Sequence, residues 1–256
     1  MPDPVERLRA LHHGPPILVL PNAWDAATAR LFEAEGFPAI ATTSAGVAAA
    51  LGYPDGGVVP SREMIEAVAR IVRAVKVPVT ADIEHAYAAT PDAVAEVVLR
   101  VIAAGAVGIN LEDYVPGADQ LEPLALQVGK ITTIIKAATK AGVRIVINAR
   151  TDVFLRAIGA ADARLDAAVA RGKAYLAAGA DCVYPIFLSD RAAIAAFVPA
   201  AGGPVNILGM PTAPPRDELA ALAIVRDVAR ELMARGTYGA FTGHAMEFDE
   251  VNELMK

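Results

Sequence analysis

Short apolar runs alternate with stretches of helical periodicity along most of the chain. Ile65, Val68, Ala69 and Val72 keep the i, i+3, i+4, i+7 spacing of an amphipathic helix, and Ser61 is the expected N-cap. The apolar runs are too short for helices and are bounded by turn residues, so they predict buried strands. The predicted strands are 17–20, 38–43, 77–83, 107–111, 144–149, 181–186 and 204–208.

The order of these elements predicts successive βα units and a parallel sheet. An Ala-Gly pair before an apolar run recurs at Gly105, Gly142 and Gly179, roughly every 35 residues, as expected of a repeated unit. Strands that are apolar on both faces favour a (β/α)₈ TIM-type barrel over an open doubly wound sheet. No linker interrupts the pattern, so residues 1–256 are predicted to form a single barrel domain.

The eighth strand of the barrel is the least clear element. Residues 215–236 show mainly one helical pattern, within which 223–225 could supply a very short strand. We therefore expect the eighth strand to be short or missing. A nucleotide site has no support, because neither a Gly-x-Gly-x-x-Gly segment after the first strand nor a Walker sequence occurs.

Composition excludes several classes of protein. With 55% hydrophobic and 20% charged residues the chain can bury a large core. A net charge of −6 gives no electrostatic reason to expect nucleic acid or an anionic membrane as partner. Cys182 is the only cysteine, which excludes an intrachain disulfide or a thiolate zinc site. The first residues do not resemble a signal peptide, and no apolar run approaches the ~20 residues of a membrane span, so a cytoplasmic location is expected.

Acidic residues stand where predicted strands end. Asp82 and Glu84 close one strand, Glu112 closes the next, and Asp55 follows a Gly-Tyr-Pro turn. Parallel strands of a barrel end at one mouth, so these carboxylates are expected to share one site for a hard divalent cation. Arg150, at the end of a later strand, would supply the countercharge for an anionic substrate.

Six motifs, in order and with barrel-like spacing, resemble the isocitrate lyase/phosphoenolpyruvate mutase superfamily. The similarity runs from Leu20 to about Thr212. The motifs are Pro21-Asn-Ala-Trp-Asp25, Thr42-Thr-Ser-Ala-Gly46, Leu51-Gly-Tyr-Pro-Asp55, Ala81-Asp-Ile-Glu84, Ala104-Gly-Ala-Val-Gly-Ile-Asn-Leu-Glu-Asp113 and Asn148-Ala-Arg-Thr-Asp152.

The resemblance implies a modified barrel whose C-terminal helix is exchanged with a neighbouring subunit, giving homodimers or homotetramers. The segment 228–256 would then dock on the partner. It also implies Mg²⁺, with Mn²⁺ as the alternative, at the strand C-termini, and substrates that are small 2-oxo acids or dicarboxylates.

The same resemblance assigns roles to residues. Asp82 would ligate the metal directly, while Asp55, Glu84 and Glu112 would hold its water shell. Arg150 would pair with the substrate or an enolate oxygen, and the predicted catalytic residues are Arg150, Asp55 and Glu112. The residues expected to bind substrate are Ser44, Ala45, Gly46, Arg150, Asn206 and Trp24.

Two departures narrow the predicted chemistry. The C–C lyases of the superfamily carry a Lys-Lys/Arg-Cys-Gly-His loop after the strand-four glutamate, but here residues 114–121 contain no cysteine, histidine or basic residue. The asparagine that phosphonate-forming mutases place in this loop is also absent. At strand six, Pro185-Ile186 replaces a Pro-Glu pair. These differences argue against cleavage of isocitrate or 2-methylisocitrate.

The sequence therefore predicts a Mg²⁺-dependent lyase-type enzyme that acts through an enolate, by decarboxylation of an oxaloacetate-like acid or by C–C cleavage. Phosphoenolpyruvate or carboxyphosphonoenolpyruvate phosphonomutase chemistry is one alternative. A protein that binds a 2-oxo acid without turnover is another. His85, directly after Glu84, is either a local acid/base group or a loop histidine that faces solvent.

Overall fold

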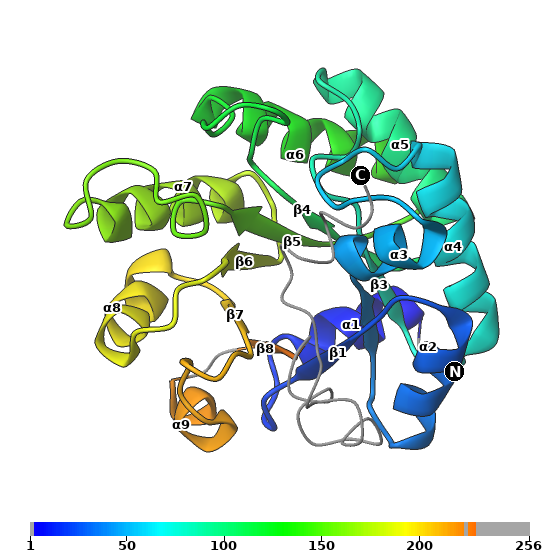
Figure 1. The fold of residues 1–256 in the computed structure, drawn as a ribbon, viewed down its shortest axis with the longest axis horizontal. Coiled ribbons are helices and arrows are strands. Elements are labelled where there is room, and N and C mark those ends of the chain that lie inside the picture. The colour runs from blue at the N-terminus through cyan, green and yellow to red at the C-terminus, as the bar shows by residue number, and fades with distance from the viewer. Residues whose placement is uncertain (1–2, 223–224, 229–256) are drawn as a thin grey trace.

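A barrel of parallel strands surrounded by helices forms the body of the computed structural model, which describes residues 3–222 and 225–228 (Figure 1). The strands are β1 (Val19–Ala23), β2 (Ile40–Thr42), β3 (Val79–Asp82), β4 (Gly108–Leu111), β5 (Val146–Thr151), β6 (Cys182–Pro185), β7 (Asn206–Leu208) and β8 (Val225–Val228). The helices are α1 (Pro4–Leu11), α2 (Ala26–Ala34), α3 (Ser44–Leu51), α4 (Ser61–Ala74), α5 (Pro91–Ala103), α6 (Leu124–Lys140), α7 (Arg164–Ala177), α8 (Arg191–Ala201) and α9 (Arg216–Ala221).

The strand order is that of a TIM-type barrel, as predicted. The eight strands run β6-β5-β4-β3-β2-β1-β8-β7, and every neighbouring pair is parallel. One isolated parallel bridge between Val183 and Val205 joins β6 to β7 and closes the ring. The eighth strand exists and is four residues long, which confirms a short strand rather than a missing one.

The seven strands predicted from apolar runs are all present, but each begins one or two residues later than predicted. Leu18, Ala39, Ile145 and Val205 precede their strands and are nevertheless buried. An apolar run therefore reports burial, and burial begins before backbone pairing does.

The starts of α2 and α4 differ in their caps. The side chain of Asp25 accepts a hydrogen bond from the Thr28 N–H at 2.7 Å and caps α2. Pro60 occupies the N-cap of α4, and Ser61 is its first residue. Helix α4 therefore begins one residue earlier than Ser61 as the N-cap would predict.

Helix α1 fills the N-terminal end of the barrel with apolar side chains. Leu8 is fully buried and belongs to one cluster with Leu20 of β1, Ala41 of β2, Val146 of β5 and Cys182 of β6. This end is therefore closed by packing. The opposite end, where the strands finish, remains for chemistry, as in other barrels of this kind.

The C-terminal docking prediction concerns residues 228–256, of which 229–256 lie outside the described residues. The predicted homodimer or homotetramer therefore stays a prediction, as does a single domain over residues 1–256. Within the part of the chain that the structure describes, no helix is both long and apolar enough to cross a membrane.

Asp113 ties three elements of the barrel together from a fully buried position. Its carboxylate accepts hydrogen bonds from the Tyr175 hydroxyl at 2.6 Å, from Arg171 at 3.1 Å and from the Asp152 N–H at 2.9 Å. Arg171 and Tyr175 lie on α7, and Asp152 follows β5. Removing this acceptor leaves three donors without their partner.

Asp113→Ala is expected to lower the free energy of unfolding by about 3 kcal/mol, because breaking a buried ion pair strands its partner. Urea denaturation followed by circular dichroism measures the change. Glu218→Ala is the matched control, since Glu218 forms an exposed pair with Arg191 and its loss should cost less than about 1 kcal/mol. Equal losses in the two variants would contradict the assigned role of Asp113.

Candidate active site

The mouth at the C-terminal end of the barrel contains a cavity of about 350 Å³. Its position follows from the parallel pairing of β3, β4 and β5, which brings the C-terminal ends of these strands to the same end of the barrel. Five of the predicted residues line this cavity: Ser44, Asp55, Glu84, Glu112 and Arg150. The lining residues are Ser44, Asp55, Gly56, Glu84, Glu112, Tyr114, Asp119, Arg150, Leu155 and Arg156.

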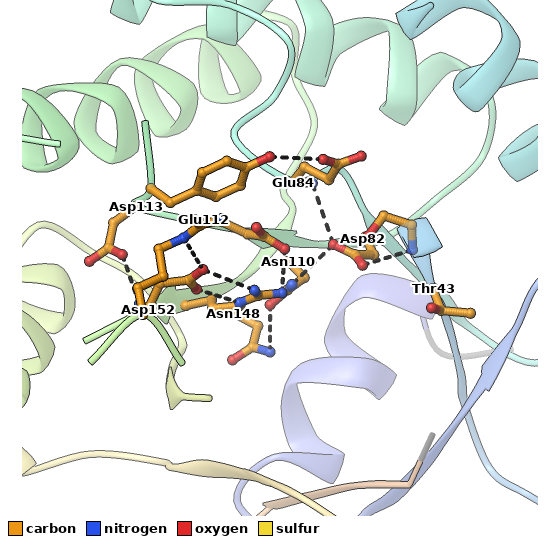
Figure 2. Close-up of polar contacts among 12 residues, drawn as sticks. Thr43, Asp82, Glu84, Asn110, Glu112, Asp113, Asn148 and Asp152 are labelled. Atoms are coloured by element: carbon orange, nitrogen blue, oxygen red, sulfur yellow. Dashed lines mark hydrogen bonds and ion pairs between the residues drawn. The ribbon is translucent and has the colours of Figure 1, made fainter. Parts of the chain in front are cut away.

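Asp82 lies at the end of β3 and is held by neighbouring donors (Figure 2). Its Oδ2 accepts the Ser44 N–H at 2.8 Å, and its Oδ1 accepts Asn110 Nδ2 at 3.1 Å. Asn148 Nδ2 in turn donates to Asn110 Oδ1 at 3.2 Å. A chain of amides from β5 through β4 thus fixes the orientation of this carboxylate.

Glu84 is almost fully buried, and its surroundings strongly raise the pKa of its carboxyl group. Burial, together with repulsion from Asp82 and Asp55, raises the pKa of Glu84 to about 8. The hydroxyls of Tyr114 and Tyr87 donate to its two oxygens at 3.1 and 3.3 Å, which opposes part of that shift. The site therefore collects more negative charge than its own donors neutralise.

The backbone after β3 is strained where it carries Glu84. Glu84, Ala86 and Tyr87 have φ values of 51°, 65° and 54°, in the left-handed region that non-glycine residues rarely adopt. Such conformations cost of order 1–3 kcal/mol each and persist where the surrounding structure enforces them, which is often at functional sites. The strain turns Glu84 toward the cavity.

Arg150 lies between two carboxylates. Its Nε and one terminal nitrogen donate to the two oxygens of Asp152 at 2.7 and 3.1 Å, and the other terminal nitrogen donates to Glu112 Oε1. Burial acts to lower the pKa of Arg150, but these two carboxylates outweigh it and raise the pKa further. Burial raises the pKa of Glu112, while Arg150 opposes that change.

Asp55 enters the cavity wall from the loop between α3 and α4. Burial raises the pKa of this carboxyl, and the charge of Asp82 raises it further. The Asp55 side chain therefore experiences the same crowded negative field as Glu84, although it comes from a different segment of the chain.

The amides expected to bind a substrate carboxylate are partly occupied. Thr43 caps α3 and accepts the Gly46 N–H at 3.3 Å, while the Ser44 N–H is bound to Asp82. Among the described residues, the Ala45 N–H is the one of these three amides without a protein acceptor. A carboxylate at this helix start would meet Ala45 first.

Of the six predicted substrate residues, Ser44 and Arg150 line the cavity, whereas Ala45, Gly46, Trp24 and Asn206 do not. Trp24 lines a second cavity of about 390 Å³ between α2, α3 and α4, together with Val47, Leu51 and Arg70, and does not line the first cavity. Asn206, the first residue of β7, is buried in the barrel wall, and neither of its side-chain polar atoms has a hydrogen-bond partner among the described residues. Residue spacing alone did not separate these positions from the cavity wall.

His85 packs between two aromatic rings instead of facing open solvent. Its ring lies 5.6 Å from the ring centres of both Tyr87 and Tyr114. Burial lowers the pKa of His85 to about 4, so the imidazole is neutral at pH 7. His85 does not line the cavity, and Gly57 of the Asp55 loop packs directly over its ring.

The loop that follows β4 is a short hairpin. Tyr114 and Leu121 form an isolated antiparallel bridge, and the Val115 N–H donates to the Gln120 carbonyl at 3.1 Å. At the base of the hairpin, the fully buried Lys130 binds Glu122 at 2.8 Å, and Arg171 donates to the Glu122 carbonyl at 2.9 Å. Asp119, from the tip of this hairpin, lines the cavity.

Five lining residues were not predicted from the sequence: Gly56, Tyr114, Asp119, Leu155 and Arg156. Tyr114 directly follows the Glu112-Asp113 pair, so its position after a strand end was a usable signal. Arg156 stands six residues after Arg150, beyond the strand, and only the turn of residues 152–158 brings it back to the cavity. Asp119 reaches the cavity because of the path of the hairpin, which the sequence pattern does not reveal.

No three acidic, histidine or cysteine side chains within the described ranges converge as a ready-made set of metal ligands. The site instead offers carboxylate oxygens around one cavity, which Asp55, Glu84 and Glu112 line. Asp82 is not among the lining residues, but it lies close enough for its charge to act on all three. Such an arrangement suits an ion that keeps several of its waters, which Mg²⁺ does in proteins.

Comparison with known proteins places this geometry in a family. The profile of the phosphoenolpyruvate phosphomutase family matches residues 8–248. A 2-methylisocitrate lyase of Bacillus subtilis is 33% identical over 186 residues, which are 70% of this chain and 58% of the relative. An oxaloacetate decarboxylase of Rhodopseudomonas palustris is 31% identical over 211 residues, 80% of this chain and 70% of the relative.

A solved structure agrees in both fold and sequence. The crystal structure of a putative phosphonomutase from Burkholderia cenocepacia superposes with a TM-score of 0.84 and 39% identity, and the match covers 93% of this chain and 95% of that one. Since the family profile spans nearly the whole chain and the solved structure shares its fold, the chain belongs to the phosphoenolpyruvate phosphomutase family, within the isocitrate lyase/phosphoenolpyruvate mutase superfamily of lyases and mutases.

Proposed function

We propose that the protein is a Mg²⁺-dependent lyase that cleaves a bond to C3 of a small 2-oxo acid, with decarboxylation of oxaloacetate as the leading reaction. The observation that carries this proposal is the shared cavity, in which Arg150 faces Asp55, Glu84 and Glu112. The similarity to an oxaloacetate decarboxylase over 80% of the chain supports the same chemistry.

The residues present fit a divalent cation. Burial, together with repulsion from Asp82 and Asp55, raises the pKa of Glu84 to about 8, and a doubly charged ion beside this carboxyl would favour its ionised form. All the nearby donors are oxygens, which hard cations prefer. Asp82 would hold the ion directly, and Asp55, Glu84 and Glu112 would bind its waters. Mn²⁺, with similar ligand preferences, is the alternative.

The bound ion would orient the carboxylate and keto oxygens of the substrate and polarise the keto group. The chain's own residues do the rest. Cleavage of the C3–C4 bond of oxaloacetate releases CO₂ and leaves the electron pair as an enolate of pyruvate, which then takes a proton from water at C3. Arg150, whose side chain is held in place by Asp152, would stabilise the negative charge that develops on the keto oxygen.

Cleavage of 2-methylisocitrate is not proposed, despite the similarity to a lyase of that name. Residues 114–121 form a short hairpin. It brings Asp119 to the cavity, but it contains no thiol, imidazole or ammonium group. Protonating the leaving group of that reaction needs an acid that this hairpin does not supply.

A phosphonomutase reaction is the second candidate. The 39% identical structure is described as a putative phosphonomutase, and the matched family profile carries the phosphomutase description. In this reaction the phosphoryl group moves between the enol oxygen and C3, so the same cavity would stabilise a similar enolate. Binding of a 2-oxo acid without turnover is the remaining alternative, favoured by the lack of a proton donor on the hairpin.

A direct assay separates these candidates. With Mg²⁺, the protein is expected to release pyruvate from oxaloacetate faster than buffer that contains the same Mg²⁺, and coupled lactate dehydrogenase measures the product. Phosphorus NMR of phosphoenolpyruvate and phosphonopyruvate detects any P–C chemistry. A phosphonate signal without pyruvate release would replace the first candidate by the second, and calorimetric binding without either product would favour the non-catalytic one.

Asp82→Ala is expected to weaken Mg²⁺ binding by at least about 100-fold, because even residues that only support metal ligands typically contribute 10–100-fold. The barrel should stay folded, since Asp82 lies at its mouth. Calorimetric titration of Mg²⁺ measures the change. Asp190→Ala is the control: it removes the exposed carboxylate that caps α8 and should leave the metal affinity unchanged. Unchanged affinity in Asp82→Ala would reject Asp82 as the ligand.

Arg150→Lys is expected to lower kcat/KM by about 100-fold or more, because a lysine cannot reproduce the fork that Asp152 positions. Mg²⁺ affinity should change far less, because Asp82 is untouched. Steady-state kinetics and Mg²⁺ titration measure the two effects. Arg9→Lys is the matched control, since Arg9 binds Asp181 on the strand end opposite the cavity. A normal kcat/KM in Arg150→Lys would exclude Arg150 from the reaction.

A further inference from the structure

Arg156 is a second guanidinium on the wall of the active-site cavity. It lies in the turn after β5, where its N–H donates to the Asp152 carbonyl at 2.9 Å. Its side chain is 31% exposed, whereas that of Arg150 is 12% exposed. Arg156 therefore stands nearer the entrance of the cavity, and Arg150 nearer its floor.

The contacts of the Arg156 side chain leave the two terminal nitrogens of its guanidinium group available to a ligand. Its central carbon lies 4.3 Å from the centre of the Tyr114 ring, a cation–π contact. Its Nε donates to Asp152 Oδ2 at 3.4 Å. Among the described residues, the two terminal nitrogens have no hydrogen-bond acceptor. The contacts thus fix the position of the guanidinium but do not use its outer edge.

Arg150 is in the opposite condition. Each of its three nitrogens already donates to a carboxylate oxygen of Glu112 or Asp152. Two negative groups therefore surround one positive group at the floor of the cavity. An anionic substrate gains less from a charge that is already balanced, so a second anionic group on the substrate needs another cation.

One carboxylate sets the distance between the two guanidiniums. Asp152 is fully buried, and it accepts Arg150 at both oxygens and Arg156 at Oδ2. Its own N–H is fixed by Asp113. Both arginines are therefore anchored on the same rigid group, close enough to line one cavity of small-molecule size.

Resting on the proposed function, we propose that Arg156 determines substrate specificity by binding a second anionic group, so that the protein selects 2-oxo acids that carry a distal carboxylate or phosphonate. A guanidinium fork pairs with either group through two parallel hydrogen bonds. A 2-oxo acid with a single carboxylate leaves this fork without a partner and binds more weakly.

The test compares ligands with one and two anionic groups. Oxaloacetate and phosphonopyruvate carry two, and pyruvate carries one. For each, Kd is measured by calorimetry with Mg²⁺ where the ligand is not turned over, and KM where it is. In Arg156→Gln the constants for the first two are expected to rise about 10- to 100-fold, while that for pyruvate changes less than about twofold. Arg156→Lys should lose part of the same preference.

Arg70→Gln removes an exposed arginine from α4, outside this cavity, and serves as the charge-matched control. An equal loss for one- and two-anion ligands in Arg156→Gln overturns the inference. Thermal melting checks that the variant is folded. If it is not, the wild-type protein decides: equal affinity for pyruvate and for both dianionic ligands also overturns the inference.

The outcomes for the two proposals are separable. Selective loss of two-anion ligands without turnover by the wild type supports the role of Arg156 and removes the lyase proposal. Turnover of oxaloacetate with unselective effects of Arg156→Gln supports the lyase proposal and removes the role of Arg156. Whether oxaloacetate or phosphonopyruvate loses more identifies the distal group as carboxylate or phosphonate.

Discussion

Repulsion between buried carboxylates is the constraint that the active-site end of this barrel must satisfy. Parallel strands deliver Asp82, Glu84 and Glu112 to one mouth, and the loop before α4 adds Asp55. The protein opposes this repulsion with fixed donors: the Ser44 and Asn110 N–H groups on Asp82 and two tyrosine hydroxyls on Glu84. Negative charge still remains in excess, and this excess makes the mouth suitable for a cation.

The acidic residues of this region divide into two groups by their partners. Asp113 and Asp152 are fully buried and bind arginines, so they position other side chains. Glu84 and Asp55 line the cavity and have raised pKa values, so they face the space where a ligand would sit. Glu112 combines both features, because it lines the cavity and also binds Arg150.

The order of strands, their parallel arrangement and five of the ten residues of the cavity wall could be predicted from the sequence, because strand ends in a barrel meet at one mouth. Glu84, Glu112 and Arg150 lie in or near a strand in sequence, whereas Asp55 comes from the loop between α3 and α4. Trp24 also follows a strand, but its ring turns outward to the helices, which spacing does not reveal. Arg156 and Asp119 depend on the path of loops, so only three-dimensional structure places them on the wall.

The hairpin of residues 114–121 determines how the mouth of the barrel is reached. Its base is fastened by Lys130, a side chain without solvent contact, and by Arg171. Swinging the hairpin inward would separate a buried ion pair, which is energetically costly. The base of the hairpin is consequently tied to α6 and α7, so any movement on this side of the entrance would be confined to the tip that carries Asp119.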